Sequence, residues 1–193
     1  LSMTGHSCSQ VMAPVLCAKN RPLTKIALLS DYFVILSVLS LIGMYISSDF
    51  SRLEIDLGGC LENYKYFRSM LKDSTRLLVL VKANAYGHGA VQFASVMEKA
   101  GVNYLAVAYP VEGMELRQAG IKSPIMVLTA GTDSFGGIVS YGLEPGIPNM
   151  YALRILCDVL EERGVTDYPI HIKLDTGMHR LGFMTDELPE LMD

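Results

Sequence analysis

The chain has 193 residues, a net charge of −4 at neutral pH and a hydrophobic content of 50%. This length allows one domain with a sizeable core, and the apolar half of the composition excludes a disordered chain. Because the chain is acidic and has no block of Lys or Arg, we expect no nucleic-acid partner. The mean hydropathy of +0.30 is high for a soluble domain, and much of the excess comes from one segment.

That segment spans residues 26–46, where 16 of 21 residues are hydrophobic and only Asp31 is charged. About 20 apolar residues can cross a bilayer as a helix, and the basic residues before this segment fit a signal-anchor. Asp31 opposes a membrane helix, because a carboxylate inside the bilayer is costly. Three interpretations of residues 1–48 stay open: a membrane helix, part of an upstream fused domain, or a misassigned start, since the chain begins with Leu1.

Residues 49–193 are predicted to form an α/β domain. Residues 52–57 alternate as a short strand, whereas residues 77–81 are continuously apolar, as in a parallel strand buried on both faces. The later strands are predicted at 104–108, 125–128, 143–146 and 170–174, and the helices at 61–71, 91–100, 111–119, 134–141 and 150–163. Several helices end at a glycine, which is the typical stop. These βα units predict a parallel sheet, either a barrel or an open doubly wound sheet.

The four cysteines are scattered singly, at Cys8, Cys17, Cys60 and Cys157. No C-x-x-C pair or Cys/His ligand spacing is present, so no metal site is predicted. Isolated thiols are typical of a reducing compartment. We therefore expect a cytoplasmic protein, with anchoring to a membrane through residues 26–46 as the alternative.

The first motif whose side chains could support catalysis is V-K-A-N-A-Y-G-H-G, at residues 81–89. Lys82 ends a predicted buried strand, which places its amine at the edge of the sheet where α/β active sites form. Desolvation lowers the pKa of an amine and favours nucleophilic chemistry. The structural alternative is a lysine that extends to solvent from a strand end.

The second motif is H-I-K-L-D-T-G-M-H-R-L-G-F, at residues 171–183. Strand alternation puts His171, Lys173 and Asp175 on one face, and predicts that Ile172 and its apolar neighbours pack under helices. An ordinary ion-pair network is the structural alternative. Arg180, in a glycine-flanked loop after this strand, favours a functional site instead.

Taken together and in this order, the two motifs closely resemble alanine racemase, a fold-type III enzyme that depends on pyridoxal 5'-phosphate. The resemblance runs from about Ser51 to the end, and residues 54–57 resemble the opening strand of the family. It implies a (β/α)₈ TIM-type barrel, cut here after about five βα units.

The resemblance also implies a role for four residues. Lys82 would attach the cofactor covalently and act as one of two catalytic bases, and Tyr86 would hydrogen-bond the cofactor phosphate. Arg180 would contact the phenolic oxygen of the cofactor and lie near the substrate carboxylate. Lys173 matches a position that is often carbamylated in the family. The second base of the family is a tyrosine from a partner subunit, so we expect a homodimeric parent and an inactive fragment.

The expected activity is interconversion of L- and D-alanine, a small-molecule amino-acid substrate, for peptidoglycan precursor supply. Alanine and serine racemases share both motifs, so the sequence does not decide between these two substrates. Two alternatives stay open: a membrane-anchored serine or alanine racemase, and a non-catalytic barrel that binds pyridoxal phosphate.

Overall fold

The computed structural model describes residues 53–192. The predictions for residues 1–48, including the membrane helix at 26–46, lie outside the described residues. Among the helices that are described, none combines the length and the apolar character that a membrane crossing requires.

Five parallel strands form one sheet in the order β1-β2-β3-β4-β5. Their bounds are Leu78–Leu80 (β1), Tyr104–Val107 (β2), Ile125–Val127 (β3), Glu144–Ile147 (β4) and His171–Ile172 (β5). Strict chain order is the arrangement of a (β/α)₈ barrel, whereas an open doubly wound sheet reverses its order at a switch point. The strand order therefore confirms a partial barrel over the other sheet that the spacing had allowed.

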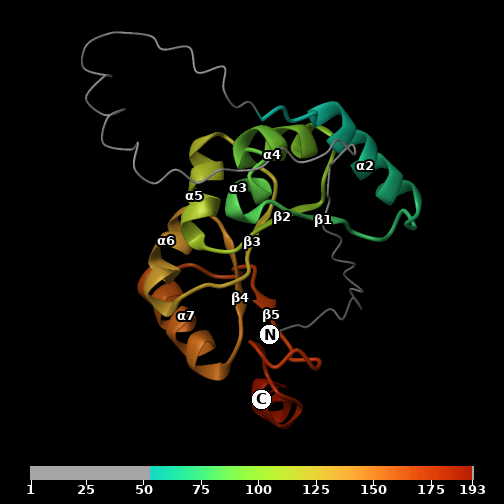
Figure 1. The fold of residues 1–193 in the computed structure, drawn as a ribbon. Coiled ribbons are helices and arrows are strands. Elements are labelled where there is room, and N and C mark those ends of the chain that lie inside the picture. Colours follow the sequence, from blue (N-terminus) through green and yellow to red (C-terminus); the bar gives the residue numbers. More distant parts are fainter. Residues whose placement is uncertain (1–52, 193) are drawn as a thin grey trace, which may run out of the picture. The chain divides into compact units, whose positions relative to one another are not determined.

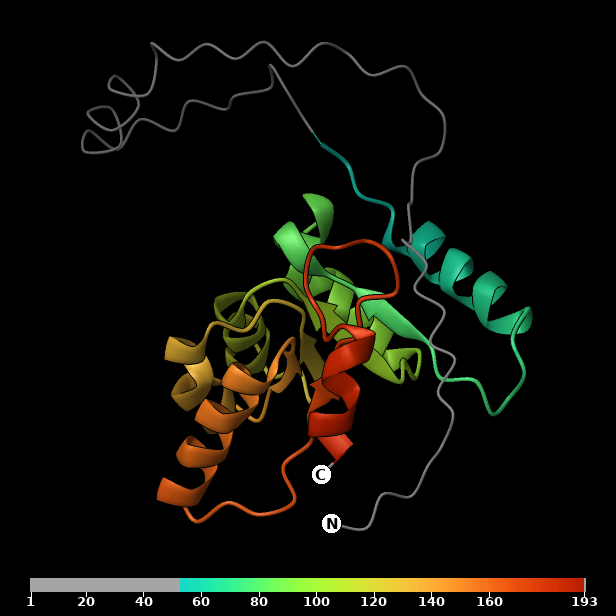
Figure 2. The same cartoon turned by 90° about the horizontal axis from the view of Figure 1, so that it is seen from below.

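Helices follow the strands and lie on the outer side of the curved sheet (Figures 1 and 2). The longer helices are α2 (Leu57–Ser69), α4 (Ala90–Lys99), α5 (Pro110–Gln118), α6 (Phe135–Ser140) and α7 (Met150–Glu162). Short elements are α3 (Lys82–Tyr86), η2 (Thr132–Ser134), η3 (Thr185–Glu187) and α8 (Leu188–Met192). The predicted glycine stops are confirmed at Gly101, Gly120 and Gly164, whose positive φ angles end the helical conformation.

The central strands of the sheet are buried on both faces. On the inner face Leu78, Ala106 and Met126 form a cluster, against which Tyr104 packs. The alternate residues on the outer face are fully buried in β2 and β3, where α5 and its neighbours cover them. Gly113 of α5 shows how close this packing is, because a Cβ there would meet the Leu143 side chain at 2.9 Å. Continuous apolar runs are expected for strands in this setting.

The strand predicted at residues 52–57 is wrong over the described residues. Residues 53–56 form no strand, and α2 begins already at Leu57. An alternating pattern makes a strand only where a neighbouring strand accepts its hydrogen bonds, and β1 pairs in the described sheet with β2 alone. Leu53, at the start of this stretch, is 76% exposed. The resemblance of residues 54–57 to an opening strand therefore does not produce one here.

Arg117 of α5 ties together the loops that enter β3 and β4. Its guanidinium donates to the carbonyl oxygens of Ile121 (2.8 Å), Ser123 (2.7 Å), Tyr141 (3.2 Å) and Gly142 (3.1 Å). Burial lowers the pKa of this group, and the nearby carboxylates of two glutamates oppose that effect. The four bonds fix the N-terminal ends of two strands.

Glu98 and Tyr168 act at the same end of the sheet. One Glu98 carboxylate oxygen accepts hydrogen bonds from the backbone amides of Lys122 (2.7 Å) and Ser123 (2.6 Å) and from the Ser123 hydroxyl (2.9 Å). The Tyr168 hydroxyl donates to the Leu143 carbonyl at 2.5 Å. Burial raises the pKa of Tyr168 to about 12, and the Glu144 carboxylate adds to this effect. Both side chains hold the backbone in place.

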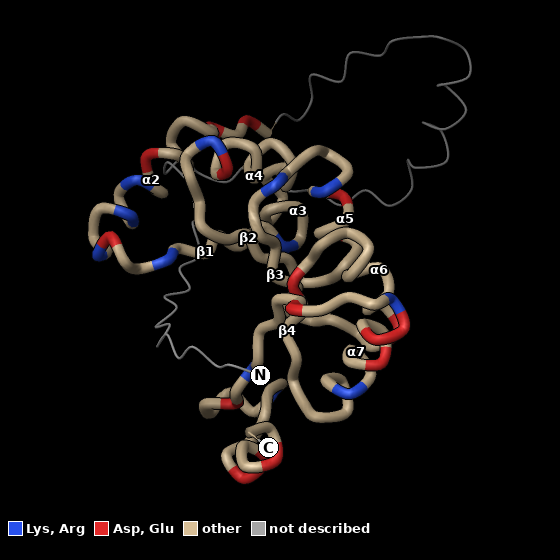
Figure 3. Tube along the Cα trace, turned by 180° about the vertical axis from the view of Figure 1, so that it is seen from behind, with Lys and Arg blue, Asp and Glu red and all other residues tan. Residues whose placement is uncertain are grey.

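Both signs of charge are spread over the outer helices α2, α4, α5 and α7 (Figure 3). Arg154 of α7 and Glu190 of α8 form an exposed ion pair with an N···O distance of 2.7 Å. An exposed pair of this kind stabilises a fold by less than about 1 kcal/mol. The outer helices α2, α4, α5 and α7 therefore each carry charges of both signs.

Candidate active site

Lys82 stands where β1 ends, at the edge of the sheet predicted from the sequence. Val81, the residue before it, is still held by the sheet, because its amide donates to the Ala106 carbonyl at 2.8 Å. The Lys82 side chain is half-buried. Its amine lies 6.0 Å from the ring centre of Tyr86, the next predicted site residue, whose side chain is 46% exposed. Both residues thus lie in the short segment that follows β1, at the C-terminal edge of the sheet.

A left-handed helical turn follows Lys82. The φ angles of Ala83, Asn84, Ala85 and Tyr86 all lie between 52° and 56°. Each non-glycine residue in this conformation costs roughly 1–2 kcal/mol, because its Cβ approaches the carbonyl oxygen. Such turns persist only where their surroundings hold them, and they cluster at functional sites. The sequence prediction missed this turn, since K-A-N-A-Y has no glycine before Gly87.

Glu112 of α5 is a further residue that the sequence prediction missed. One carboxylate oxygen accepts the Ala83 amide at 2.6 Å, and the other accepts the amides of Ala108 (2.7 Å) and Tyr109 (2.9 Å). Glu112 stands three residues after Tyr109, and Pro110 opens the helix, which is a recognisable capping pattern. That pattern signals the bond to Tyr109. It gives no sign that the same carboxylate also holds the turn after Lys82.

The loop that carries Arg180 is shaped by Asp175. One Asp175 oxygen accepts the amides of Gly177 and His179, both at 2.9 Å. These backbone hydrogen bonds hold the pKa of Asp175 below its usual value, and the neighbouring His179 side chain contributes. Strand alternation placed Asp175 on the same face as His171 and Lys173, but its carboxylate instead accepts hydrogen bonds from its own loop.

Gly182 closes this loop. Its φ is 138°, and a Cβ there would meet the Asp175 nitrogen at 2.6 Å and the Leu174 carbonyl carbon at 2.7 Å. The chain is pinned at the same place, where Phe183 donates to the Lys173 carbonyl at 2.7 Å. Only glycine allows two backbone segments to approach this closely. The G of the L-G-F motif is therefore required by the geometry of the loop.

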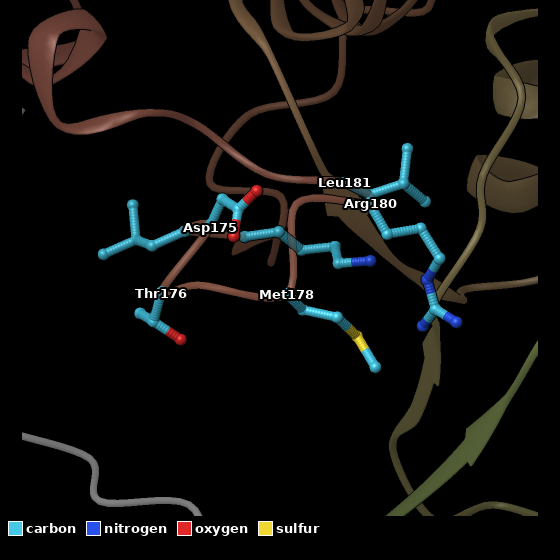
Figure 4. Close-up of a pocket in the computed structure, with 7 residues that line it drawn as sticks. Asp175, Thr176, Met178, Arg180 and Leu181 are labelled. Carbon is cyan, nitrogen blue, oxygen red and sulfur yellow. The ribbon is translucent and has the colours of Figure 1, made fainter.

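Lys173 and Arg180 line one pocket of about 200 Å³, together with Met178 and other loop residues (Figure 4). The Lys173 amine donates to the Leu128 carbonyl at 3.3 Å. Burial lowers the pKa of Lys173, and the positive charge of Arg180 lowers it further. Arg180 itself is exposed, and it donates no hydrogen bond to any residue between 53 and 192. Two cationic side chains therefore converge on a site that can receive an anion.

His171 faces the barrel interior, as predicted. Its ring nitrogen Nε2 lies 2.8 Å from a carboxylate oxygen of Glu144, which is only 8% exposed. The ring also stacks edge-on against Tyr104, with 5.6 Å between ring centres. These contacts satisfy a buried polar pair in the way that an interior requires. His171 is thus used inside the barrel, beneath the pocket.

The opposite face of this strand differs from the prediction. Ile172 and Leu174 were expected under helices, but they are 36% and 50% exposed. The physical reason is that β5 lies at the margin of the described sheet, and the short helix α8 leaves these two side chains uncovered. Lys82 and Arg180 follow the first and the last strand of this sheet. They share its C-terminal edge without a contact between them in the described part of the chain.

The described part of the chain is similar to a known protein family. A family model described as "Alanine racemase, N-terminal domain" matches residues 55–193, which contain both motifs and all five strands. The chain belongs to this family. The resemblance drawn from the two motifs is thereby confirmed, and so is the partial (β/α)₈ barrel.

Individual alanine racemases agree with this assignment. The chain is 39% identical to that of Synechocystis sp. over 132 residues, which are 67% of this chain and 35% of the relative. The solved structure of the E. faecalis enzyme has a TM-score of 0.66 and 33% identity, over 72% of this chain and 38% of that one. The structure from Bartonella henselae, with a TM-score of 0.65 and 26% identity over 72% and 38% of the two chains, carries covalently bound pyridoxal phosphate. The chain thus spans about a third of the length of the alanine racemases that it matches.

Proposed function

We propose that this chain supplies the cofactor-binding face of a pyridoxal-phosphate-dependent alanine racemase, which interconverts L- and D-alanine for peptidoglycan precursors in the cytoplasm. The observation that supports it most is the position of Lys82. This residue is half-buried at the C-terminal end of a barrel strand, its amine lies near the ring of Tyr86, and a left-handed turn follows it. Active sites of (β/α)₈ barrels form at this end of the strands.

The donor groups at this edge fit pyridoxal phosphate, which presents an aldehyde, a phosphate and a phenolic oxygen. Lys82 offers an amine for the aldehyde carbon, Tyr86 a hydroxyl for the phosphate, and Arg180 a guanidinium for the phenolic oxygen. The carboxylates of Glu112 and Asp175 both accept backbone amides. Neither carboxylate therefore competes with the anionic groups of the cofactor for Lys82 or Arg180.

When bound, the cofactor supplies an electron sink that stabilises negative charge at the α-carbon of an amino acid. Lys82 takes or returns the α-proton on one face of the substrate. Arg180 binds the substrate carboxylate, because its guanidinium matches a carboxylate in charge and shape. Inversion needs a second base on the opposite face, and we assign that face to a tyrosine of a partner subunit in a homodimer.

Lys173 is proposed to carry a carbamate. Burial lowers the pKa of Lys173, and repulsion from the positive charge of Arg180 lowers it further. Reaction with carbon dioxide would form an N–C bond and release a proton, leaving a negative group beside Arg180. Repulsion then becomes attraction, which orients the guanidinium for its ligand.

The direct test is a titration of the purified chain with pyridoxal phosphate, followed by absorbance. We expect Lys82→Ala to abolish the absorbance of the covalently bound cofactor. Lys122→Ala is the matched control, because Lys122 is an exposed lysine at the other end of the strands. Equal binding by the Lys82→Ala variant would overturn the assignment of Lys82.

A second test separates a racemase half-site from a barrel that only stores the cofactor. In deuterated water, a chain with one base should exchange the α-hydrogen of one alanine enantiomer without inverting it. NMR of alanine in the presence of the loaded chain measures this exchange, and serine measured in parallel reports substrate preference. Cofactor binding without exchange of either amino acid would favour the non-catalytic barrel.

A further inference from the structure

We propose that Glu112 is a positioning residue for Lys82, acting through the left-handed turn that follows this lysine. The inference rests on the proposed function, because it concerns how the cofactor-binding amine is oriented. Glu112 belongs to the neighbouring βα unit and reaches across to the turn, so it connects two units at the C-terminal edge of the barrel.

The geometry assigns different tasks to the two oxygens of this carboxylate. Oε2 accepts the amides of Ala108 and Tyr109, at 2.7 and 2.9 Å, and so caps the helix to which Glu112 belongs. Oε1 accepts the Ala83 amide at 2.6 Å. A cap of α5 needs only the first oxygen. The second one holds the residue directly after Lys82, in a charge-assisted hydrogen bond of the stronger kind.

The turn makes other hydrogen bonds as well, and the Ala85 amide ties it to the end of β1 by donating to the Val81 carbonyl at 2.9 Å. The Asn84 side chain accepts the Ala90 amide at 2.8 Å, and the Gly87 amide donates to the Ala83 carbonyl at 3.1 Å. The Asn84 bond ties the turn to the start of α4, and the Gly87 bond lies within the turn. The bond to Glu112 relates the turn to α5 across the next βα unit, and we infer that it contributes to the direction in which Lys82 leaves the sheet.

Glu112→Gln is the variant that separates the two tasks. The amide group keeps one acceptor oxygen, and it satisfies more donors when that oxygen faces Ala108 and Tyr109 than when it faces Ala83. The amide nitrogen of the new side chain then opposes the Ala83 N–H, so the bond to the turn is lost while the cap of α5 remains. Glu112→Ala removes both.

The first measurement is amide hydrogen exchange of the chain without cofactor. We expect Glu112→Gln to speed exchange in residues 83–87 by roughly tenfold to a hundredfold, as loss of one hydrogen bond to a charged group allows. Residues 108–112 should exchange as before. Glu98→Ala is the control, because it removes a carboxylate that accepts backbone amides at the opposite end of the strands. It should leave exchange in residues 83–87 unchanged.

The second measurement is the fraction of Lys82 that is labelled by pyridoxal phosphate and borohydride, read by peptide mass. We expect a several-fold lower fraction in Glu112→Gln and an unchanged fraction in Glu98→Ala, even if the control loses as much thermal stability. Unchanged exchange and unchanged labelling in Glu112→Gln would overturn the proposal. A wild-type chain that leaves Lys82 unlabelled would instead refute the proposed function, and the exchange data would still decide whether Glu112 holds the turn.

Discussion

At the N-terminal ends of the strands the Arg117 guanidinium donates to four backbone carbonyls, whereas at the C-terminal ends Arg180 donates to none within residues 53–192. Both residues are arginines of the same barrel domain. The first uses four of its N–H groups to hold two loops, and the second presents its donors to a pocket. The difference shows which charged groups build the fold and which remain available for a ligand.

The carboxylates at the C-terminal edge sharpen this comparison. Glu112 and Asp175 lie near the site, yet both accept backbone amides and behave like Glu98 at the opposite edge. A functional edge therefore contains two kinds of charged residue. Acidic groups shape its loops, and the basic groups of Lys82 and Arg180 stay open to an anionic cofactor.

The largest effect is expected from Gly182→Ala, which strains the loop that carries Arg180. The new Cβ would meet backbone atoms of Asp175 and Leu174 at 2.6 and 2.7 Å. Backbone atoms move out of the way at a higher energetic cost than the end of a flexible side chain. We expect a loss of about 3 kcal/mol in the free energy of unfolding, measured with urea. Gly177→Ala, in the same loop at φ 123° with open space around it, should lose only about 1 kcal/mol from backbone strain. Equal losses would show that the close approach is unimportant.

The next effect compares the two arginines directly. Arg117→Ala should lower the free energy of unfolding by about 2–3 kcal/mol, because partly buried carbonyls lose a charged donor. Arg180→Ala should change it by no more than about 0.5 kcal/mol, as is usual for an exposed residue. Denaturant unfolding of both variants checks this order. A larger loss for Arg180→Ala would reverse the roles that the structure gives to the two ends.

Tyr168→Phe tests the N-terminal edge at high pH. Losing the hydrogen bond to Leu143 should cost about 1 kcal/mol at neutral pH. The folded pKa of about 12 lies above the usual tyrosine value of 10.0, so the stabilisation is complete below pH 10 and is lost as the pH rises through 12. The free energy of unfolding, measured between pH 9 and 12, should therefore fall less steeply with pH in Tyr168→Phe than in the wild type. Tyr151→Phe, at an exposed position, should retain the wild-type slope.

The smallest effect concerns Lys173. Its lowered pKa means that the neutral amine is available at a lower pH than for an exposed lysine. With ¹³C-bicarbonate, NMR should show a carbamate signal that grows as the pH rises, and Lys173→Gln should lack it. The folded chain binds fewer protons than the unfolded chain at alkaline pH below 10.5, so stability should rise with pH there and this rise should vanish in the variant. A carbamate signal that survives in Lys173→Gln would contradict the assignment.

Much of this architecture could be predicted from local sequence. The continuous apolar run at residues 77–81 and the later strands gave a parallel sheet, because burial on both faces leaves a direct mark on composition. Lys82 could be found because it directly follows such a strand, and Arg180 because it lies in a glycine-flanked loop after the last one. The sequence pattern alone left barrel and open sheet undecided, since strand order depends on pairing between distant segments.

The parts that could not be predicted depend on backbone geometry and on distant contacts. The left-handed turn after Lys82 is made of residues that rarely adopt this conformation, so its composition carries no signal. Glu112 has an ordinary helix-capping position, and its second partner lies 29 residues away. Residues 52–57 show the opposite error, because their alternation predicted a strand for which the described sheet has no place.

The central claim is that Lys82 is the residue to which the cofactor is attached. The most direct measurement is to reduce the mixture of chain and pyridoxal phosphate with borohydride and to locate the label by peptide mass spectrometry. The account predicts one dominant label, on Lys82, at stoichiometric cofactor. A label spread over the exposed lysines, or concentrated on another lysine such as Lys173, would contradict it.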